Sequence, residues 1–97
     1  MLENIKNFIW DTEKNKINIQ KHGVTFAEAE SVFYDKLAVV AEDEKHSQDE
    51  DRFLIVGKSR KSRLILACYC IRNTETVRII SARKAEKLEI EWYKEGL

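Results

Sequence analysis

Four apolar segments joined by short connections constrain the fold of this chain more than any other feature. They are rich in β-branched and aromatic residues and cover residues 37–41, 52–57, 64–71 and 76–82. Residues 72–75 form a connection short enough for a hairpin. Because successive strands joined by short connections pair antiparallel, the segments predict an antiparallel four-stranded meander. Within it, the strand at residues 37–41 is expected to be buried on both faces.

The residues before the meander predict one strand and two helices. Residues 5–10 are rich in β-forming side chains and predict a first strand. Asp11 can cap a helix over residues 12–22, and Gly23 supplies the positive φ that ends it. A second helix is expected over residues 26–34, where apolar side chains recur at helical spacing.

Two further signals complete the helical assignment. Thr25 and Glu28 have the spacing of a capping box, in which each side chain bonds the backbone N–H of the other residue. From Lys84 the period becomes helical, and Gly96 ends that helix. Its apolar face consists of Ala85, Leu88 and Trp92. The predicted order is β-α-α-β-β-β-β-α, an α+β fold whose helices cover the meander, in a single domain over residues 1–97.

The net charge is zero, but the charges are unevenly distributed along the chain. Residues 42–51 carry six acids and one lysine, which favours an exposed loop. Residues 52–97 carry eleven cations and five acids, so this part of the chain can attract a polyanion. The overall neutrality gives no support to nucleic-acid binding.

Several classes of protein and of site are disfavoured. No apolar run approaches the ~20 residues of a membrane span, and the first residues lack a signal-peptide layout, so we expect a cytoplasmic protein that does not contact membranes. Cys68 and Cys70 lie two residues apart and are expected to be reduced core thiols. The chain has no glycine-rich phosphate loop, no HxxxH and no CxxC, so neither a metal nor another cofactor is predicted.

A set of cations and one imidazole carries the candidate chemistry. Arg83 and Lys84 follow the strand end Ile79-Ile80-Ser81-Ala82, a position that can hold a phosphate. Lys21 and His22 close the first predicted helix, and Arg52 opens a strand directly after the acidic stretch. Cleavage of RNA without a metal needs two proton transfers and a donor for the added negative charge, and His, Lys and Arg can supply these.

Each of these residues also has a purely structural interpretation. His22 can simply complement the dipole at a helix C-terminus, and Arg83 and Lys84 can be solvated loop charges. Arg78, in an apolar strand, reaches the sheet edge or pairs with an acid. His46 is expected to be a solvated loop residue. The cations Lys58, Arg60, Lys61 and Arg63 either solubilise a turn or attract phosphate, and Tyr93 can show its hydroxyl at a helix edge.

The sequence resembles the BrnT family of toxins over nearly its whole length. The similarity begins at residues 10–15 and Asn18, and continues through the Lys21-His22-Gly23-Val24 segment with Phe26, Ala29 and Phe33. It includes Asp51-Arg52, Gly57-Lys58-Ser59 and the Arg78–Ala85 segment, and closes with Glu89 and Tyr93. The combination of the segments KHGV and RIISARKA is specific.

The resemblance implies a RelE-like α+β fold and the toxin half of a type II toxin–antitoxin module. Such a toxin is a metal-independent endoribonuclease that arrests translation and growth. A BrnA-type antitoxin with a ribbon-helix-helix part neutralises it by direct contact, and the complex binds operon DNA only through that antitoxin. We rank His22, Arg52, Arg83 and Lys21 as catalytic, and Arg78, Lys84, Tyr93 and Lys58 as RNA-binding.

Two other functions remain open from the sequence. The chain can be a non-catalytic module that acts with a DNA-binding antitoxin in autorepression, because the helix at residues 12–22 has few apolar anchors and suits completion by a partner. It can also be a catalytically silent member of a toxin fold.

Overall fold

A five-stranded sheet with the order β1-β5-β4-β3-β2 forms the centre of the molecule. The computed structural model describes residues 2–47 and 50–96. The strands are β1 (Asn7–Ile9), β2 (Val39–Glu42), β3 (Phe53–Lys58), β4 (Leu64–Arg72) and β5 (Thr76–Lys84). Strands β2 to β5 form the predicted antiparallel meander.

The first predicted strand, over residues 5–10, is observed as β1, but its pairing with the meander was not predicted. Strand β1 pairs in parallel with the beginning of β5, where Asn7 lies opposite Thr76 and Ile9 opposite Arg78. Residues 10–75 lie between these two strands along the chain. Because a parallel pair of this kind depends on contacts far apart in the sequence, no local pattern of residues indicates it.

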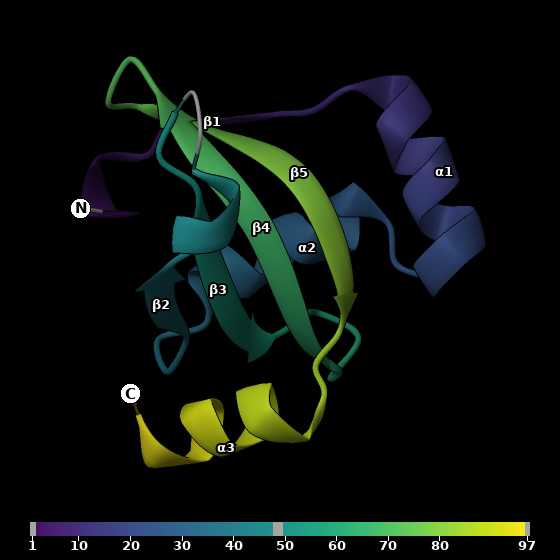
Figure 1. The fold of residues 1–97 in the computed structure, drawn as a ribbon, viewed down its shortest axis with the longest axis vertical. Helices are drawn as coiled ribbons and strands as arrows, with labels where there is room; N and C mark the ends of the chain where they lie inside the picture. Colours follow the sequence, from purple (N-terminus) through teal and green to yellow (C-terminus); the bar gives the residue numbers. More distant parts are fainter. Residues whose placement is uncertain (1, 48–49, 97) are drawn as a thin grey trace.

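Three α-helices flank the sheet (Figure 1). Helix α1 (Thr12–His22) lies beside β5, α2 (Phe26–Ser31) lies behind the sheet, and α3 (Lys87–Glu95) lies across one end of it. Short 3₁₀ turns cover Leu2–Asn4, Val32–Tyr34 and Glu44–His46. No helix in the described part of the chain is long and apolar enough to cross a membrane.

Several predicted boundaries need correction. The second helix becomes a 3₁₀ turn at Val32, and the third begins at Lys87 rather than Lys84 because β5 continues through Lys84. Leu88 was expected in the buried stripe of α3, yet it is 56% exposed, whereas Glu89 is only 7% exposed. Helix α3 lies at the end of the sheet and packs against β3, so it does not bury a full apolar stripe.

The acidic stretch and β2 also differ from the prediction. Glu42 belongs to β2, and Glu44–His46 form a 3₁₀ turn, so the region is not a simple loop. Strand β2 is the edge strand of the sheet rather than a strand buried on both faces. Among its residues only Val39 is buried, and Glu42 is exposed.

The hydrophobic core lies between α2 and one face of the sheet. Its buried side chains include Phe26, Ala29 and Val32 from the α2 segment and Ile55, Ile65, Ala67, Tyr69, Val77 and Ile79 from the strands. The rings of Phe33 and Tyr69 meet edge to face at 4.9 Å, a favourable geometry for aromatic pairs. This layer makes the sheet a rigid base for whatever lies on its other face.

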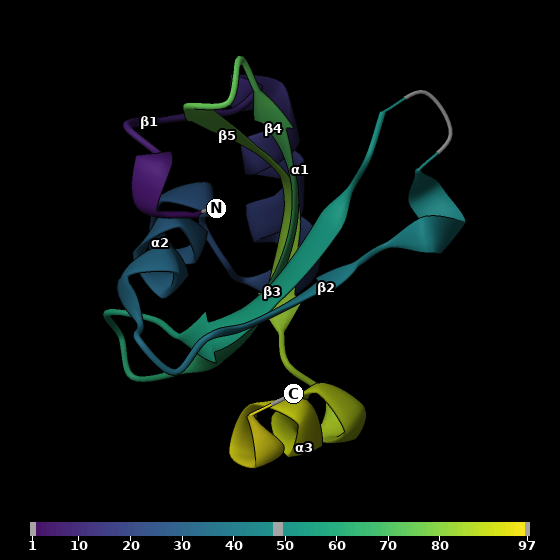
Figure 2. The same cartoon turned by 90° about the vertical axis from the view of Figure 1, so that its left-hand side faces the viewer.

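The opposite face of the sheet is not covered by α2. Figure 2 shows the β2–β3 hairpin leaning away from β4 and β5 on this side. The register shifts between Cys68 and Tyr69, so that Cys68 pairs with Ser81 while Tyr69 pairs with Ile79. Ile80 is the extra residue of this β-bulge, and bulges of this kind redirect side chains next to functional sites.

Candidate active site

A pocket of about 300 Å³ lies on the open face of the sheet, between β5 and the turn that follows β2. Arg52, at the start of β3, and Arg83, near the end of β5, both line it. Its other lining residues are Asp43, His46, Leu54, Leu66, Cys68, Ile80 and Ser81. The antiparallel meander thus brings together two arginines that are far apart in the sequence.

Arg83 is held by the beginning of α3. Its Nη1 donates to Glu89 Oε1 at 2.8 Å and to the Lys84 carbonyl at 3.1 Å. Burial favours a higher pKa for the Glu89 carboxyl, but the hydrogen bonds from Arg83 and from the Glu86 N–H outweigh it and lower that pKa. The ionised Glu89 therefore orients the guanidinium and is also the group that a phosphate must compete with.

Arg52 is fixed through its backbone rather than its side chain. Its N–H donates to Ser47 Oγ at 2.9 Å, and its carbonyl accepts from the Asp43 N–H at 2.8 Å. Within residues 2–47 and 50–96, its guanidinium makes no side-chain hydrogen bond. The half-buried Arg52 side chain is therefore the freer of the two arginines in the pocket.

His46 lies in the same pocket, which the sequence did not indicate. Its Nδ1 is 2.9 Å and 3.1 Å from the two carboxylate oxygens of Asp43. The side chain is 62% exposed, as expected for a loop residue, but it is oriented by Asp43 instead of being freely solvated. The three-residue spacing of Asp43 and His46 could have indicated this contact. It was not recognised because residues 42–51 contain six acids, any of which could have been the partner.

His22 and Lys21 line a second pocket of about 200 Å³. Lys14, Ile17 and Asn18 of α1 also line it, together with Ile80 and Ser81 of β5. Ile80 and Ser81 are therefore shared by the two pockets. The structure thus places His22 and Lys21 in one pocket and His46, Arg52 and Arg83 in the other.

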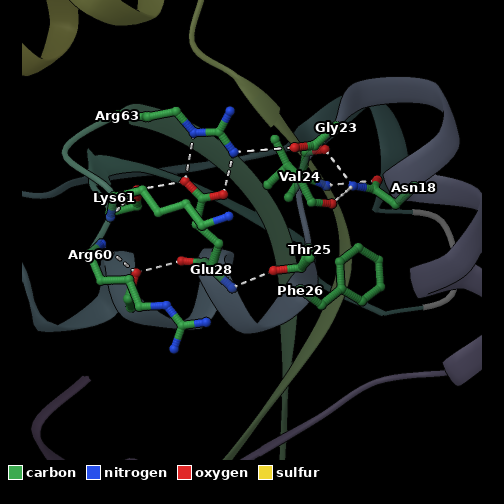
Figure 3. A network of polar contacts seen from close by, with 12 residues as sticks. Asn18, Gly23, Val24, Thr25, Phe26, Glu28, Arg60, Lys61 and Arg63 are labelled. Carbon is green, nitrogen blue, oxygen red and sulfur yellow. Dashed lines mark hydrogen bonds and ion pairs between the residues drawn. The ribbon is translucent and has the colours of Figure 1, made fainter.

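The segment after His22 is anchored by a network of polar contacts (Figure 3). Arg63 Nη2 donates to the Gly23 carbonyl at 3.2 Å, and Asn18 Nδ2 donates to the Val24 carbonyl at 2.9 Å. Gly23 has φ 68°, in the left-handed region, as predicted for the residue that ends α1. These contacts fix where α1 ends and hence where His22 sits.

Glu28 is the centre of this network and is fully buried. Arg63 pairs with both of its carboxylate oxygens, and Ser59 Oγ donates to it at 2.7 Å. The hydrogen bonds from Arg63, opposed by burial, lower the pKa of Glu28. The Glu28 N–H bonds Thr25 Oγ1 at 2.9 Å as predicted, but the reciprocal side-chain bond to Thr25 was wrong because Glu28 pairs with Arg63 instead.

The family model for "Ribonuclease toxin, BrnT, of type II toxin-antitoxin system" matches residues 10–89. This chain belongs to the BrnT family. The fold is similar to the 1.1 Å crystal structure of the Brucella abortus ribonuclease toxin BrnT, with a TM-score of 0.64 and 28% sequence identity. That similarity covers 84% of this chain and 97% of the Brucella chain. None of the curated proteins matches the sequence.

The four residues of this BrnT-family chain that were predicted to bind RNA, Lys58, Arg78, Lys84 and Tyr93, lie outside the two pockets. Tyr93 O–H and the Lys58 N–H both donate to Asp35 Oδ2 at 2.7 Å. Burial favours a higher pKa for Asp35, but these hydrogen bonds outweigh it and lower the pKa. The structure therefore places Lys58 and Tyr93 beside each other at Asp35, and their RNA-binding roles remain predictions.

Arg78 and Lys84 lie on the same strand as Arg83. Arg78 lies opposite Cys70 of β4 and Ile9 of β1 in the sheet register. Its charge contributes, less than the Lys14 N–H bond does, to lowering the pKa of Asp11. Lys84 is exposed at the end of β5. Contacts of Arg78 and Lys84 with RNA also remain predictions.

Both cysteines of this BrnT-family chain are free thiols, as predicted, but only Cys70 is buried in the core, whereas Cys68 is half-buried. Burial, together with the nearby Asp43 carboxylate, raises the pKa of Cys68 to about 11. Cys68 is therefore a protonated thiol at neutral pH and part of the pocket wall. Within the described ranges, 2–47 and 50–96, no group of three or more His, Cys, Asp or Glu side chains is arranged to hold a metal ion.

Proposed function

We propose that this BrnT-family protein is an endoribonuclease that cleaves RNA without a metal ion and thereby inhibits translation and growth. The observation that supports this most is the presence of Arg52 and Arg83 in one pocket. The phosphate gains negative charge when the 2′-oxygen attacks it, and guanidinium groups held in place are suited to stabilise such charge.

His22 is the proposed proton-transfer residue, and Lys21 a supporting cation. Both line the pocket that shares Ile80 and Ser81 with the arginine pocket, so RNA that crosses this wall would meet both sets of side chains. Attack of the 2′-oxygen and departure of the 5′-oxygen would leave a 2′,3′-cyclic phosphate and a 5′-hydroxyl. A positioned imidazole contributes about 10²–10⁴-fold to such a step.

The partner we propose is a BrnA-type antitoxin with a ribbon-helix-helix part, through which alone the complex contacts operon DNA. The family description names a type II toxin–antitoxin system, in which the antitoxin is a protein. Ile17 and Ile19 of α1 are 49% and 40% exposed and offer apolar area to a partner. This exposed helix also supports the second candidate function, a non-catalytic module that acts with a DNA-binding antitoxin in autorepression.

Expression of the chain alone in a bacterium tests the two functions. We expect growth arrest with fragmented RNA for the parent chain, and relief in Arg83→Ala and His22→Ala. Lys36→Ala, an exposed cation outside both pockets, is the control and should arrest growth like the parent. Normal growth with folded parent protein would contradict the nuclease and favour the binding module.

A chelator test addresses the metal-independent part of the proposal. The purified chain should cleave RNA at the same rate before and after treatment with EDTA, because the residues in the pockets can supply both proton transfer and charge stabilisation. Activity that disappears with EDTA and returns with a divalent cation would refute metal independence while leaving ribonuclease activity intact.

A further inference from the structure

His46 has no part in the function proposed above, yet it lines the same pocket as Arg52 and Arg83. Asp43 holds its ring by Nδ1, with both carboxylate oxygens within 3.1 Å. A carboxylate that accepts a hydrogen bond from Nδ1 fixes the orientation of the imidazole and leaves Nε2 as the nitrogen that exchanges a proton with a ligand. His46 is thus prepared for proton transfer in a way that an unpaired loop histidine is not.

The turn that carries His46 is tied to Arg52. The Asp43 N–H donates to the Arg52 carbonyl at 2.8 Å, and the Arg52 N–H donates to Ser47 Oγ at 2.9 Å. Ser47 Oγ in turn donates to the Asp43 carbonyl at 2.7 Å. These three bonds hold the Glu44–His46 turn against the start of β3. The same three hydrogen bonds therefore position both His46 and Arg52.

The two histidines of the chain line two pockets that share residues. His46 lines one pocket and His22 the other, and Ile80 and Ser81 line both. In phosphoryl transfer the attacking and leaving oxygens lie roughly in line through the phosphorus, so their protons are handled on opposite sides of it. A phosphate held by Arg52 and Arg83 near Ser81 would lie where the two pockets meet, and each pocket has one imidazole in its lining.

We infer that His46 is a second proton-transfer residue of the cleavage reaction and that Asp43 is its positioning residue. This inference rests on the ribonuclease function proposed above. One imidazole takes the proton of the 2′-hydroxyl as the 2′-oxygen–phosphorus bond forms. The other gives a proton to the 5′-oxygen as the phosphorus–5′-oxygen bond breaks. The products are a 2′,3′-cyclic phosphate and a 5′-hydroxyl, and solvent restores the two protonation states.

The other side chains in the pocket leave this role to His46. The charged or titratable groups that line the pocket with it are Asp43, Arg52, Cys68 and Arg83. Arginine stays protonated at all relevant pH values and cannot act as a base. Burial keeps Cys68 protonated, with a pKa of about 11, and Asp43 is already engaged with the ring. Among the side chains of this set, proton transfer is therefore assigned to the imidazole of His46, which Asp43 orients.

A pair of matched substrates tests the inference. Each is a DNA strand with a single ribonucleotide at a position that the parent chain cleaves, and one of them has sulfur in place of the 5′-bridging oxygen. A thiolate leaves without needing a proton, so this substrate bypasses the general acid only. Rates are measured for the parent, His22→Ala, His46→Ala and His46→Asn. The control is Lys45→Ala, which alters the residue just before His46 in the same turn, and Lys45 does not line the pocket.

Both His46 variants should cleave the oxygen substrate about 10²–10⁴-fold more slowly than the parent, with KM little changed, while Lys45→Ala cleaves normally. On the sulfur substrate, either the His46 or the His22 variants should recover, and the other should not, because only one imidazole is the acid. A His46 variant as fast as Lys45→Ala, or recovery of both or neither histidine variant, overturns the inference. A parent chain that cleaves no RNA overturns the proposed function itself.

The role of Asp43 is tested separately from folding. Asp43→Asn should lower kcat in the parent background but have little further effect in the His46→Ala background, because it acts through that ring. The thermal unfolding midpoint of each variant shows whether the fold is intact. Equal losses from Asp43→Asn in both backgrounds would show that Asp43 acts independently of His46.

Discussion

The side-chain amide of Asn18 pairs with the backbone of Ala82 in the way that a neighbouring strand would. Its Nδ2 donates to the Ala82 carbonyl at 2.8 Å, and its Oδ1 accepts from the Ala82 N–H at 3.1 Å. Strand β1 covers only the beginning of β5, so Asn18 satisfies the edge of β5 further along. One amide thus attaches α1, which carries His22, to the strand that carries Ser81 and Arg83.

Replacing Asn18 should weaken both the fold and the site. Asn18→Ala leaves the N–H and carbonyl of Ala82 without these partners in a position where Asn18 itself is only 6% exposed, so we expect a loss of about 2 kcal/mol in the free energy of unfolding. Urea unfolding measures the loss. Gln20→Ala, on an exposed position of the same helix, is the control, and an equal effect of both variants would contradict this account.

Removing Arg63 should be among the most destabilising single changes to a charged residue. Among the described residues, Arg63→Ala leaves Ser59 as the one side chain that hydrogen-bonds the buried Glu28 carboxylate, and breaking such a pair costs about 3 kcal/mol or more. Adding Glu28→Gln should recover part of the loss because the uncompensated charge is removed. Arg60→Ala, on the same turn but with an exposed side chain, should change stability little.

The same ion pair predicts how stability depends on pH. The pKa of Glu28 is lower in the folded chain than its ordinary value of 4.5, so the stabilisation is fully present above pH 4.5 and is lost as the pH falls through the lowered pKa. The difference in unfolding free energy between the parent and Arg63→Ala should therefore be largest at neutral pH and shrink in acid. A difference that stays constant from pH 7 to pH 3 would argue against this pair as the cause.

Two tyrosine hydroxyls should respond in opposite ways to removal. The buried Tyr69 hydroxyl has no hydrogen-bond partner among the described residues, and burial raises its pKa to about 12. Tyr69→Phe should therefore be neutral or stabilising by about 1 kcal/mol, whereas Tyr93→Phe loses the bond to Asp35 and should destabilise by about the same amount. Thermal or urea unfolding of the two variants gives the comparison, and destabilisation by Tyr69→Phe would reveal a partner for its hydroxyl.

The arginines of the pocket should account for part of the salt dependence of RNA binding. Each phosphate contact to a single strand contributes about 0.7 to the slope of log K against log salt concentration, so Arg52→Ala and Arg83→Ala should each reduce the slope by about 0.7. Binding of an uncleavable strand with 2′-deoxy sugars, measured across a salt series, tests this. Lys94→Ala on the exposed side of α3 should leave the slope unchanged, and a slope that responds equally to all three variants would mean a diffuse charge effect.

Local signals in the sequence were enough to place most secondary structure. Helix α1 has the predicted bounds because Asp11 caps its first turn, with the Lys14 N–H bonded to Oδ1 at 3.0 Å, and Gly23 ends it. The parallel pairing of β1 with β5 could not be found in this way, since it joins residues 7–9 to residues 76–78, which are far apart in the sequence. The start of α3 was also missed. Glu86 and Glu89 form the capping box that begins this helix, but in the sequence they look like ordinary surface acids.

The candidate site was predictable only in part, for the same reason. Arg52 and Arg83 stood out because each flanks an apolar strand, and the structure places both in one pocket. His46 did not stand out, because its candidate role depends on its contact with Asp43 and on the side chains of β3 to β5 that line the same pocket in the folded chain. Arg63 had the appearance of a surface cation, yet its partner Glu28 lies on a different element and is fully buried.

The shared wall at Ile80 and Ser81 also has a consequence for how the chain is made. A protein emerges from the ribosome N-terminus first, so His22, His46 and Arg52 are synthesised before β5. Neither pocket has its common wall, and Arg83 is missing, until that last strand has been added. A growing chain therefore cannot assemble the complete site until β5 has been synthesised and has left the ribosome.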